Sequence, residues 1–266
     1  MKVAILYICT GRYACFFPGF YESAERYLLP EAQKHYYVWT DDDSLAEKLD
    51  NVTLIHKECA GFPADSLFKF ELFLQFEEEL EKYDYVYFLN SNSEFRRRVD
   101  EEILPDESGL VAGVWHDSHA GKSYLRFHYE RNRKSLAYVA PFGNDYVYYM
   151  GGLNGGTPEA YLCMVRTLCH NIREDYNNGI IALWHDESHI NAYLRNRLCK
   201  KIGRDVCMPE EWIGEADAPM IVFRNKVLLG DCFIKNRRPG LFGRLANIPK
   251  MVWTIIRWHI EYLLTK

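Results

Sequence analysis

Short apolar runs alternate with amphipathic segments along the first 90 residues of the chain. Runs of apolar, β-branched and aromatic residues predict buried strands over residues 3–8, 35–40, 52–56 and 85–90. Apolar positions with helical spacing predict helices over 20–30, which Pro30 ends, and over 64–83. Strands that alternate with helices in this way are typical of a mostly parallel sheet with both faces covered.

The second half of the chain has a more mixed pattern. It predicts strands over 109–115 and 145–152. A helix follows, in which Thr157 is the N-cap and Pro158 occupies the first helical position. We therefore expect an α/β domain whose central sheet combines parallel and antiparallel strands.

The chain divides only near its C-terminus. No linker, repeat or low-complexity segment interrupts it before residue 236, so we expect one catalytic domain over 1–236 and a basic tail over 237–266. The tail carries six Lys or Arg residues and one acid. Its last part, 248–266, has the pattern of an amphipathic helix that lies on a membrane surface, and equally that of a helix packed on the domain or on a partner.

Composition narrows the class of protein. The net charge of −5 argues against a nucleic-acid-binding protein, because phosphate neutralisation needs a basic face. The N-terminal apolar run is too short for a signal peptide or a membrane span. The eight cysteines form no C-x-x-C pair, so we expect reduced thiols and no cysteine metal cage. These features predict a cytoplasmic protein, peripheral at the inner face of the membrane if the tail makes contact.

The stretch "ALWHDESHINAYL" (182–194) raises the question of a zinc site, since His185 and His189 are four residues apart. A zinc-hydrolase helix needs Glu directly after the first His, but Asp186 stands there and Glu187 follows. Asp186 is also a good N-cap, which would start the helix after His185. Glu187 would then lie in the first helical turn, where the helix dipole favours the ionised carboxylate. A carboxylate beside Trp184 suits a sugar site, although an ordinary capped helix start explains the pattern equally well.

Two further stretches have weaker signals. "GGLNGG" (151–156) matches neither dinucleotide-binding nor P-loop spacing, so a tight turn is the simpler interpretation, with Gly152 leaving room for a ligand near the backbone. Asn90 and Asn92 follow the strand predicted over 85–90, at the edge where α/β sheets bind ligands. Their amides are poor ligands for Mg²⁺ or Mn²⁺, and a polar turn that caps the strand is the alternative.

Taken together, these stretches resemble glycosyltransferase family 6, which includes the histo-blood-group A and B transferases and α-1,3-galactosyltransferase. The segments that carry the resemblance occur in the family's order: "HYYVWTDD", "NSNSEF", "HYERNRKSLAYV", "DYVYYMGGLNGG", "NGIIALWHDESHINAYL" and "FIKN". The resemblance implies a GT-A fold, a single Rossmann-like α/β domain. It also implies transfer of galactose or N-acetylgalactosamine from a UDP-sugar to an oligosaccharide β-galactoside acceptor, with retention of the α configuration. The chain looks like a bacterial member.

The resemblance also assigns site residues by position. Glu187 matches the catalytic glutamate, as nucleophile or as stabiliser of the oxocarbenium ion, and Asp186 is expected to hold hydroxyls of the donor sugar. The other donor-side positions are Ile8, Thr10 and Tyr13 at the uracil and ribose, Lys69, Asn90, Ser91, Asn92, Met150, Gly151 and Gly152. The acceptor-side positions are His116, His128, Trp184 and Glu187.

The sharpest departure from the family is "NSN" (90–92), where the family has Asp-Val-Asp and a manganese ion that bridges these acids and the diphosphate. We therefore expect no divalent metal and no other cofactor, with positive charge at the leaving UDP supplied by a basic side chain. The candidates are Lys226, Lys235 and Arg238. A second departure is "PEEWIGEAD" (209–217), which has no clear counterpart of the family's acceptor-binding acid.

The donor is predicted on steric grounds. Gly152 stands where the N-acetylgalactosamine-using blood-group enzyme has Gly and its galactose-using partner has Ala, whereas Met150 is the galactose-type residue. We favour UDP-GalNAc, because overlap with a β-carbon excludes the acetamido group more firmly than a Leu-to-Met change. The predicted function is α-1,3-N-acetylgalactosaminyl transfer to a fucosylated, H-type β-galactoside. A UDP-galactose-using enzyme and an inactive sugar-binding protein are the alternatives.

Overall fold

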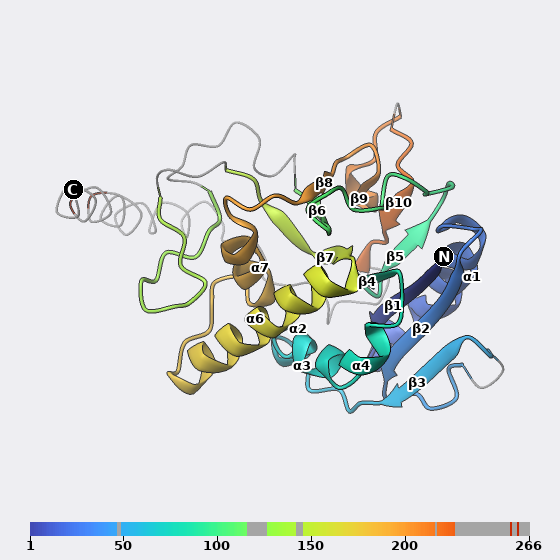
Figure 1. Ribbon diagram of the computed structural model, residues 1–266, viewed down its shortest axis with the longest axis horizontal. Helices are drawn as coiled ribbons and strands as arrows, with labels where there is room; N and C mark the ends of the chain where they lie inside the picture. Colours follow the sequence, from blue (N-terminus) through green and yellow to red (C-terminus); the bar gives the residue numbers. More distant parts are fainter. Residues whose placement is uncertain are drawn as a thin grey trace, which may run out of the picture.

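The computed structural model describes residues 1–46, 49–115, 127–141, 146–215 and 217–226, together with Ile256 and Ile260. A seven-stranded mixed sheet in the order β3-β2-β1-β4-β7-β6-β8 forms its centre (Figure 1). Its strands are β1 (Lys2–Ile8), β2 (Gln33–Thr40), β3 (Val52–His56), β4 (Tyr85–Leu89), β6 (Leu110–Val114), β7 (Tyr149–Gly156) and β8 (Lys200–Ile202). β7 runs antiparallel to its neighbours β4 and β6, and the remaining pairs are parallel. This architecture confirms the predicted α/β fold with a mixed sheet, in agreement with a GT-A-type domain.

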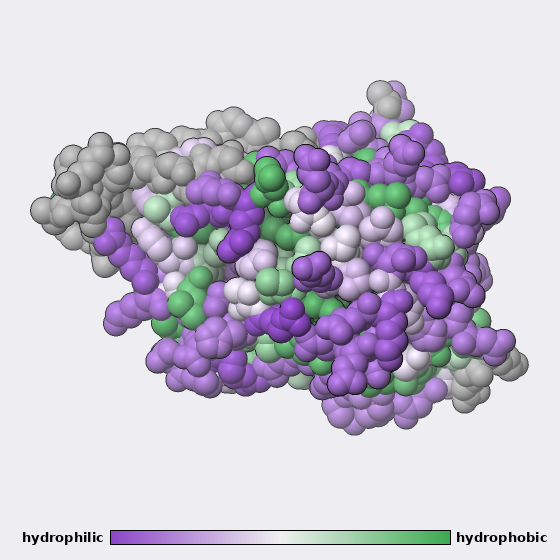
Figure 2. All heavy atoms as spheres, viewed as in Figure 1, coloured by the Kyte–Doolittle hydropathy of each residue, from purple (hydrophilic) through white to green (hydrophobic). Residues whose placement is uncertain are grey.

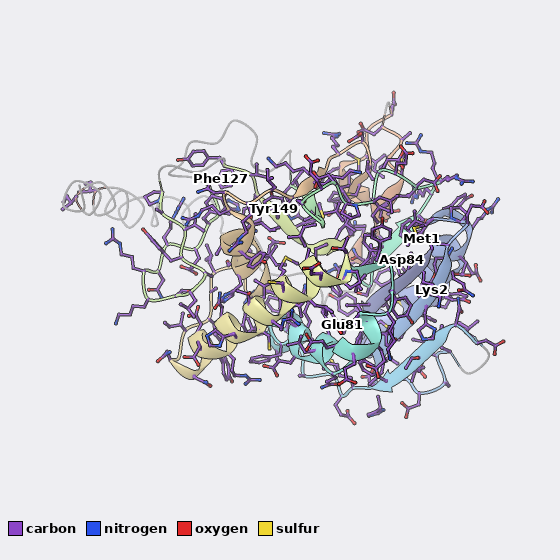
Figure 3. The ribbon with its side chains drawn as sticks, in the orientation of Figure 1. Met1, Lys2, Glu81, Asp84, Phe127 and Tyr149 are labelled. Carbon is purple, nitrogen blue, oxygen red and sulfur yellow. The ribbon has the colours of Figure 1, made fainter. Side chains whose placement is uncertain are left out.

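The start of β1 is fixed against the start of β4. The backbone N–H of Lys2 donates to Asp84 Oδ2 at 2.7 Å, and the backbone N–H of Asp84 donates to Lys2 O at 2.9 Å. Figure 3 shows Met1, Lys2 and Asp84 close together at this end of the sheet. The two strands run in parallel from this end of the sheet. They therefore end at Ile8 and Leu89 at the opposite, carboxyl end, where the polar residues of the site begin.

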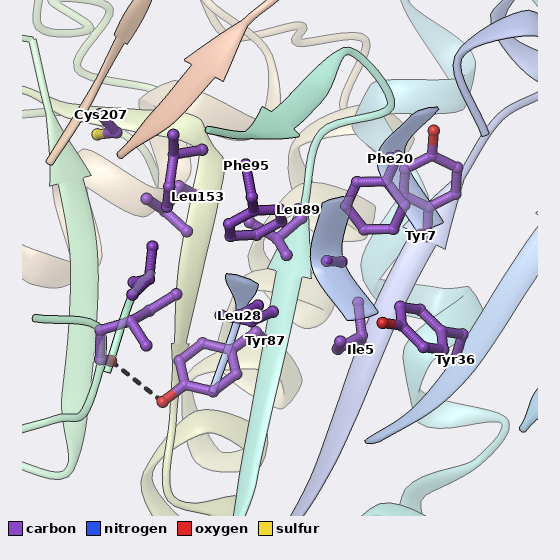
Figure 4. Packing of buried hydrophobic residues seen from close by; sticks show 14 of the residues in the cluster. Ile5, Tyr7, Phe20, Leu28, Tyr36, Tyr87, Leu89, Phe95, Leu153 and Cys207 are labelled. Atoms are coloured by element: carbon purple, nitrogen blue, oxygen red, sulfur yellow. Dashed lines mark hydrogen bonds between the residues drawn. The ribbon is translucent and has the colours of Figure 1, made fainter. Parts of the chain in front are cut away.

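One face of the sheet packs against a helix and a small second sheet. The 3-10 helix η1 (Gly11–Phe16) leads into α1 (Phe17–Tyr27), whose apolar side is buried on this face. The small sheet has the order β5-β10-β9 and contributes Phe95, Ile221 and Cys207 to the same core cluster. Its strands are β5 (Ser93–Phe95), β9 (Cys207–Pro209) and β10 (Ile221–Phe223), with η3 (Glu210–Trp212) after β9. Figure 4 shows Phe20 and Phe95 among the side chains packed on β1 and β4.

Helices cover the other face. α6 (Pro158–Asn177) and α7 (Asp186–Leu194) pack there together with α2 (Ala64–Leu67), α3 (Lys69–Leu74) and α4 (Glu77–Leu80). Apolar residues of α6 and α7 join Trp39 and Phe73 in a second core cluster. Hydrophilic side chains cover most of the molecular face shown in Figure 2, with hydrophobic residues in separate patches among them.

The strands predicted over 3–8, 35–40, 52–56 and 85–90 are confirmed, and the helix predicted to begin at Pro158 begins there. The single helix predicted over 64–83 is wrong. Non-helical backbone at Phe68 and Phe76 divides that segment into α2, α3 and α4. The ring of Phe68 packs edge-on against Tyr176 at 5.0 Å, and the ring of Phe76 packs against Trp39 at 5.8 Å. Tertiary packing of these two rings therefore overrides the local helical pattern.

The tight turn predicted for "GGLNGG" is also wrong, because β7 continues through residues 151–156 as a strand. A Cβ on Gly155 would lie 2.5 Å from Val86 O and 2.4 Å from Tyr87 Cδ1. Glycine is thus required by the close approach of β4 rather than by a turn.

The predicted domain boundary at residue 236 lies outside the described residues. Of the tail, the structure describes Ile256 and Ile260, which are helical and 44% and 50% exposed. In the part of the chain that the structure describes, no helix combines the length and apolar character needed to cross a membrane.

Candidate functional site

A large bulge in β7 forms the floor of the site. Asn154 of β7 pairs with Ala112 of β6, whereas Tyr149 pairs with Val114, so a step of five residues on β7 stands opposite a step of two on β6. Extra residues in one strand push its backbone out of the ladder and free its polar groups. The peptide groups around Gly151 are freed in this way and turn toward α7 and α3.

Gly151 is the backbone anchor for three side chains. Its N–H donates to Glu187 Oε2 at 2.7 Å. Its carbonyl oxygen accepts from Lys69 Nζ at 3.0 Å and from Asn154 Nδ2 at 3.3 Å. A Cβ at this position would lie 2.8 Å from Asp186 Oδ2, so glycine lets the first turn of α7 lie directly on the strand.

Lys69 and Asp186 form a buried ion pair. The Nζ of Lys69 lies 2.7 Å from Asp186 Oδ2, and the two residues are 3% and 7% exposed. The ammonium group also lies 4.1 Å from the ring centroid of Phe88, a cation–π distance. Removing one charge of such a pair leaves the other buried without compensation, which typically costs about 3–5 kcal/mol. The pair therefore fixes Asp186 in one position beside the bulge.

Glu187 lies beside this pair in an environment that disfavours its charge. Burial of the carboxylate raises its pKa from 4.5 to about 7, although the residue as a whole keeps an intermediate exposure. The N–H of Gly151 and donors from Tyr148 and Trp115 lower the pKa, while neighbouring Asp186 raises it. Trp115 Nε1 donates to Glu187 Oε2 at 3.5 Å. A carboxylate that titrates near neutral pH in such a setting is typical of catalytic sites.

Asn191 fastens α7 to β7. Its Oδ1 accepts from the backbone N–H of Tyr149 at 2.8 Å, and its Nδ2 donates to Tyr149 O and to Glu187 O, both at 2.8 Å. Because Asn191 lies one helical turn after Glu187, these bonds hold the first turn of the helix against the bulge. Asn191 is not among the predicted site residues, although its i+4 spacing from Glu187 places it on the same side of the helix.

The start of α7 differs in detail from the prediction. The helix spans Asp186–Leu194 and its N-cap is His185, with a φ of 54°, so Asp186 is the first helical residue and not the cap. Glu187 lies in the first turn, as predicted. The His185 ring packs edge-on against Phe62, whereas His189 Nε2 lies 3.6 Å from Asp175 Oδ2. The two histidines have different neighbours, and the described residues contain no group of three metal-ligating side chains.

The predicted nucleotide-side residues gather at the carboxyl end of β1. Ile8 ends the strand, and Thr10 is buried, with its Oγ1 donating to Asp65 Oδ2 at 3.3 Å. The backbone N–H of Tyr13, in η1, donates to Thr10 O at 3.3 Å. Lys226 arrives from beyond β10, and its Nζ lies 5.2 Å from the centroid of the Tyr13 ring.

The "NSN" segment follows β4 at the same edge and is tied down by hydrogen bonds. Asn90 Nδ2 donates to Asn92 Oδ1 at 2.9 Å, and the backbone N–H of Asn90 donates to Gly152 O at 2.8 Å. Ser91 and Asn92 are buried, and the Ser91 carbonyl accepts from Tyr7 at 2.7 Å. Two neutral amides bring no negative charge, and the Oδ1 of Asn92 already accepts a hydrogen bond, so these residues do not fit the manganese ion that the resemblance implies.

The two residues predicted to select the donor lie in the bulge. A Cβ on Gly152 would lie 3.2 Å from Asn90 Cβ and 3.6 Å from Phe223 Cε1. Met150 is 1% exposed, and its Sδ lies 2.8 Å from where a Cβ on Gly113 would be. Met150 is thus part of the packed core, whereas Gly152 borders the "NSN" segment.

Aromatic rings gather around the residues predicted to lie on the acceptor side. Trp184 is 45% exposed and stacks on His128, with ring centroids 5.8 Å apart and planes 23° apart. Trp115 packs at 5.4 Å against Trp212, which is partly exposed. Trp115 and Tyr148, which neighbour Glu187, are not among the predicted site residues. Of the predicted residues, His116, Lys235 and Arg238 lie outside the described part of the chain.

Comparison with known proteins gives one consistent family. The family model described as Glycosyltransferase family 6 matches residues 1–217. The O-antigen biosynthesis glycosyltransferase WbnI of Escherichia coli is 30% identical over 85% of this chain and 95% of its own length. Globoside alpha-1,3-N-acetylgalactosaminyltransferase 1 of Homo sapiens is 29% identical over 76% of this chain, and Histo-blood group ABO system transferase 2 of Rattus norvegicus is 28% identical over 72%. The matched regions span 59% and 58% of those two proteins.

Proposed function

Because this chain belongs to glycosyltransferase family 6, we propose that it transfers N-acetylgalactosamine from UDP-GalNAc in α-1,3 linkage to a fucosylated, H-type β-galactoside. The family makes it a glycosyltransferase with a nucleotide-sugar donor and a carbohydrate acceptor. The observation that carries the proposal is the Glu187 carboxylate, held by the Gly151 N–H in a bulged strand directly before Gly152.

The proposed chemistry is transfer with retention of the α configuration. Asp186, neutralised and positioned by Lys69, would accept hydrogen bonds from hydroxyls of the donor sugar. Glu187 would act on the anomeric carbon, as a nucleophile or as the anion that stabilises an oxocarbenium ion while it orients the acceptor hydroxyl. Both roles need the ionised carboxylate, so transfer should increase as the pH rises through about 7. Trp184 and His128 would provide an aromatic surface for the acceptor.

Gly152 supports UDP-GalNAc as the donor. A methyl group there would lie 3.2 Å from Asn90 Cβ, a tight contact at the edge of the "NSN" segment where the donor is expected to bind. Met150, the residue that favours UDP-galactose, is packed in the core, so we give its identity less weight. The human relative is named for α-1,3-N-acetylgalactosamine transfer, which agrees with this choice.

We propose that the reaction needs no divalent metal. Neutral amides stand where the family has acids, and Lys226 lies beside Tyr13 at the nucleotide end of the site. A cation there would stabilise negative charge on the leaving UDP. Lys235 and Arg238 remain candidates for the same role.

The test is product formation, followed by mass spectrometry, from UDP-GalNAc and a 2′-fucosylated galactoside in excess EDTA, with UDP-galactose in a parallel tube. Glu187→Gln protein is the matched control for contaminating activity. A mass gain of one N-acetylhexosamine in EDTA, absent with the variant, is the expected result. A gain only with Mn²⁺ would overturn metal independence, and a hexose gain would overturn the donor. No gain under any condition would favour an inactive binding protein.

A further inference from the structure

The two asparagines of "NSN" are the first members of a hydrogen-bonded chain that ends on the backbone of a distant segment. Asn90 Nδ2 donates to Asn92 Oδ1 at 2.9 Å, and Asn92 Nδ2 donates to Arg224 O at 2.7 Å. The chemistry of the groups fixes the direction of this chain. Because the Arg224 carbonyl can only accept, the nitrogen of Asn92 faces it, and the oxygen of Asn92 is left to accept from Asn90.

The contact with Arg224 continues the small sheet beyond its last residue pair. Phe223 of β10 pairs with Ser93 of β5, and the backbone N–H of Arg224 then donates to Asn92 O at 2.7 Å. Asn92 therefore bonds Arg224 twice, once through its backbone carbonyl and once through its side chain. The side-chain amide of Asn92 donates to the Arg224 carbonyl. This bond fixes the backbone at Arg224, two residues before Lys226.

The segment that Asn92 holds carries a cation to the nucleotide end of the site. Lys226 follows Arg224 by two residues, and its Nζ lies 5.2 Å from the ring centroid of Tyr13. Glu210 also binds this segment, since its Oε2 accepts from Arg224 Nε at 3.2 Å and from the backbone N–H of Asn225 at 2.9 Å. The position of Lys226 is therefore set by the residues just before it.

An aspartate could not replace Asn92 in this contact. A carboxylate has no N–H to donate, so its oxygen would face the Arg224 carbonyl oxygen at the distance where the amide now forms a bond. Loss of a buried donor and the meeting of two acceptors both disfavour the present backbone position. The amide at position 92 thus does something that the family's acid cannot do.

We propose that Asn92 is a positioning residue that fastens the backbone at Arg224 so that Lys226 lies at the phosphates of the bound donor. The inference rests on the proposed UDP-sugar donor bound without a metal. In this protein the "NSN" segment places a cation of the chain itself at the site, where the resemblance to the family implies acids and a metal ion.

The test is a double-mutant cycle of Asn92→Leu and Lys226→Met, with UDP and uridine affinities measured by isothermal titration calorimetry in EDTA. Leu has nearly the shape of Asn and carries no charge, so repulsion of the phosphates does not enter. We expect each single variant to weaken UDP binding about tenfold and uridine binding less than about twofold, since only UDP carries the phosphates. In the Lys226→Met background, Asn92→Leu should change the UDP affinity by less than about twofold.

A second variant at the same position, Asn92→Asp, also removes the amide donor, and Asn178→Asp is its matched control. Asn178 also donates its amide to a backbone carbonyl, that of Glu174 at 2.8 Å, on the exposed end of α6. Asn178→Asp should leave UDP binding unchanged. If Asn92→Leu does not fold, the cycle is run with Asn92→Asp, since charge repulsion would persist in the Lys226→Met background whereas the loss of positioning would not.

Equal loss of UDP affinity from the Asn92 change with and without Lys226 would overturn the inference, and so would wild-type affinity in Asn92→Leu. Recovery of the Asn92→Asp variant by Mn²⁺ to wild-type affinity would also overturn it, because position 92 would then act as a metal ligand. Failure of the wild-type protein to bind UDP in EDTA would instead refute the proposed metal-free function. The two failures are thereby distinguished.

Discussion

Replacing Glu187 with Gln should stabilise the protein at alkaline pH while it abolishes transfer. The folded protein raises the pKa of this carboxyl from 4.5 to about 7, mainly through burial. Between these values the folded state binds a proton that the unfolded state has released, so the free energy of unfolding falls as the pH rises. Gln is neutral at every pH and keeps an oxygen that can accept from the Gly151 N–H, so the variant escapes this loss.

The magnitude follows from the two pKa values. They differ by about 2.5, and each pH unit corresponds to about 1.4 kcal/mol, which gives about 3 kcal/mol above pH 8. Roughly 2.5 kcal/mol of this difference between variant and wild type should develop between pH 5 and pH 8 by the same relation. Titrations that the two proteins share cancel in the difference.

The assay is urea unfolding of both proteins at pH 5, 6, 7 and 8, with the free energy extrapolated to water at each pH. Glu22→Gln, at an exposed position on α1, is the control for loss of one negative charge. A difference between Glu187→Gln and wild type that stays constant from pH 5 to pH 8 would refute the reasoning, since the pKa of Glu187 would then be the same in both states.

Three further changes test the site. Lys69→Met should lower the free energy of unfolding in urea by about 3–5 kcal/mol, because it leaves Asp186 buried without its cation. A decrease below about 1 kcal/mol, with both proteins at the same pH, would contradict the buried pair. Gly151→Ala should lower kcat at least about tenfold, since its Cβ would lie 2.8 Å from the Asp186 carboxylate. Gly19→Ala, on α1, is the control and should not change kcat, because its Cβ would meet no atom outside the helix backbone within 4 Å. Gly152→Ala should lower kcat/KM for UDP-GalNAc relative to UDP-galactose by about tenfold or more, and an unchanged ratio would remove this position from donor choice.

The pattern of the sequence predicts β1, β2, β3, β4 and β6 well, because each is a short apolar run between polar turns. The strand predicted over 145–152 is displaced, since β7 spans Tyr149–Gly156, and the three-residue strands β5, β8, β9 and β10 are too short to give a pattern of their own. The pattern fails for residues 64–83, where Phe68 and Phe76 have helical spacing but turn toward Tyr176 and Trp39. It fails again at "GGLNGG", where glycine is needed by a neighbouring strand that lies far away in sequence. In both cases the deciding contact joins residues far apart in the sequence, so the spacing of apolar residues within one segment cannot predict it.

The site also combines features that local sequence signals predict with features that depend on contacts between distant segments. The position of Glu187 in the first turn of a helix follows from local signals, and the resemblance to the family identifies its role as a prediction. The bonds that the Gly151 N–H and carbonyl make with Glu187 and Lys69 depend on a bulge in β7 that has no local signal in the sequence. The contact of the Trp115 indole with Glu187 and the Lys69–Asp186 pair join segments that are distant in the sequence. The second hydrogen bond of Asn92, to a backbone carbonyl 132 positions away, is equally invisible in the sequence.

The buried pair of Lys69 and Asp186 also constrains how the protein can be made. Its members are 117 positions apart, and the bulge that supports them belongs to a third segment, in β7. A nascent chain that ends before residue 186 contains Lys69 but lacks Asp186, the carboxylate that compensates the buried charge of the lysine. We expect the helical face of the sheet to close only after α7 leaves the ribosome, so the first half of the chain should wait for the second in an open, protease-sensitive form.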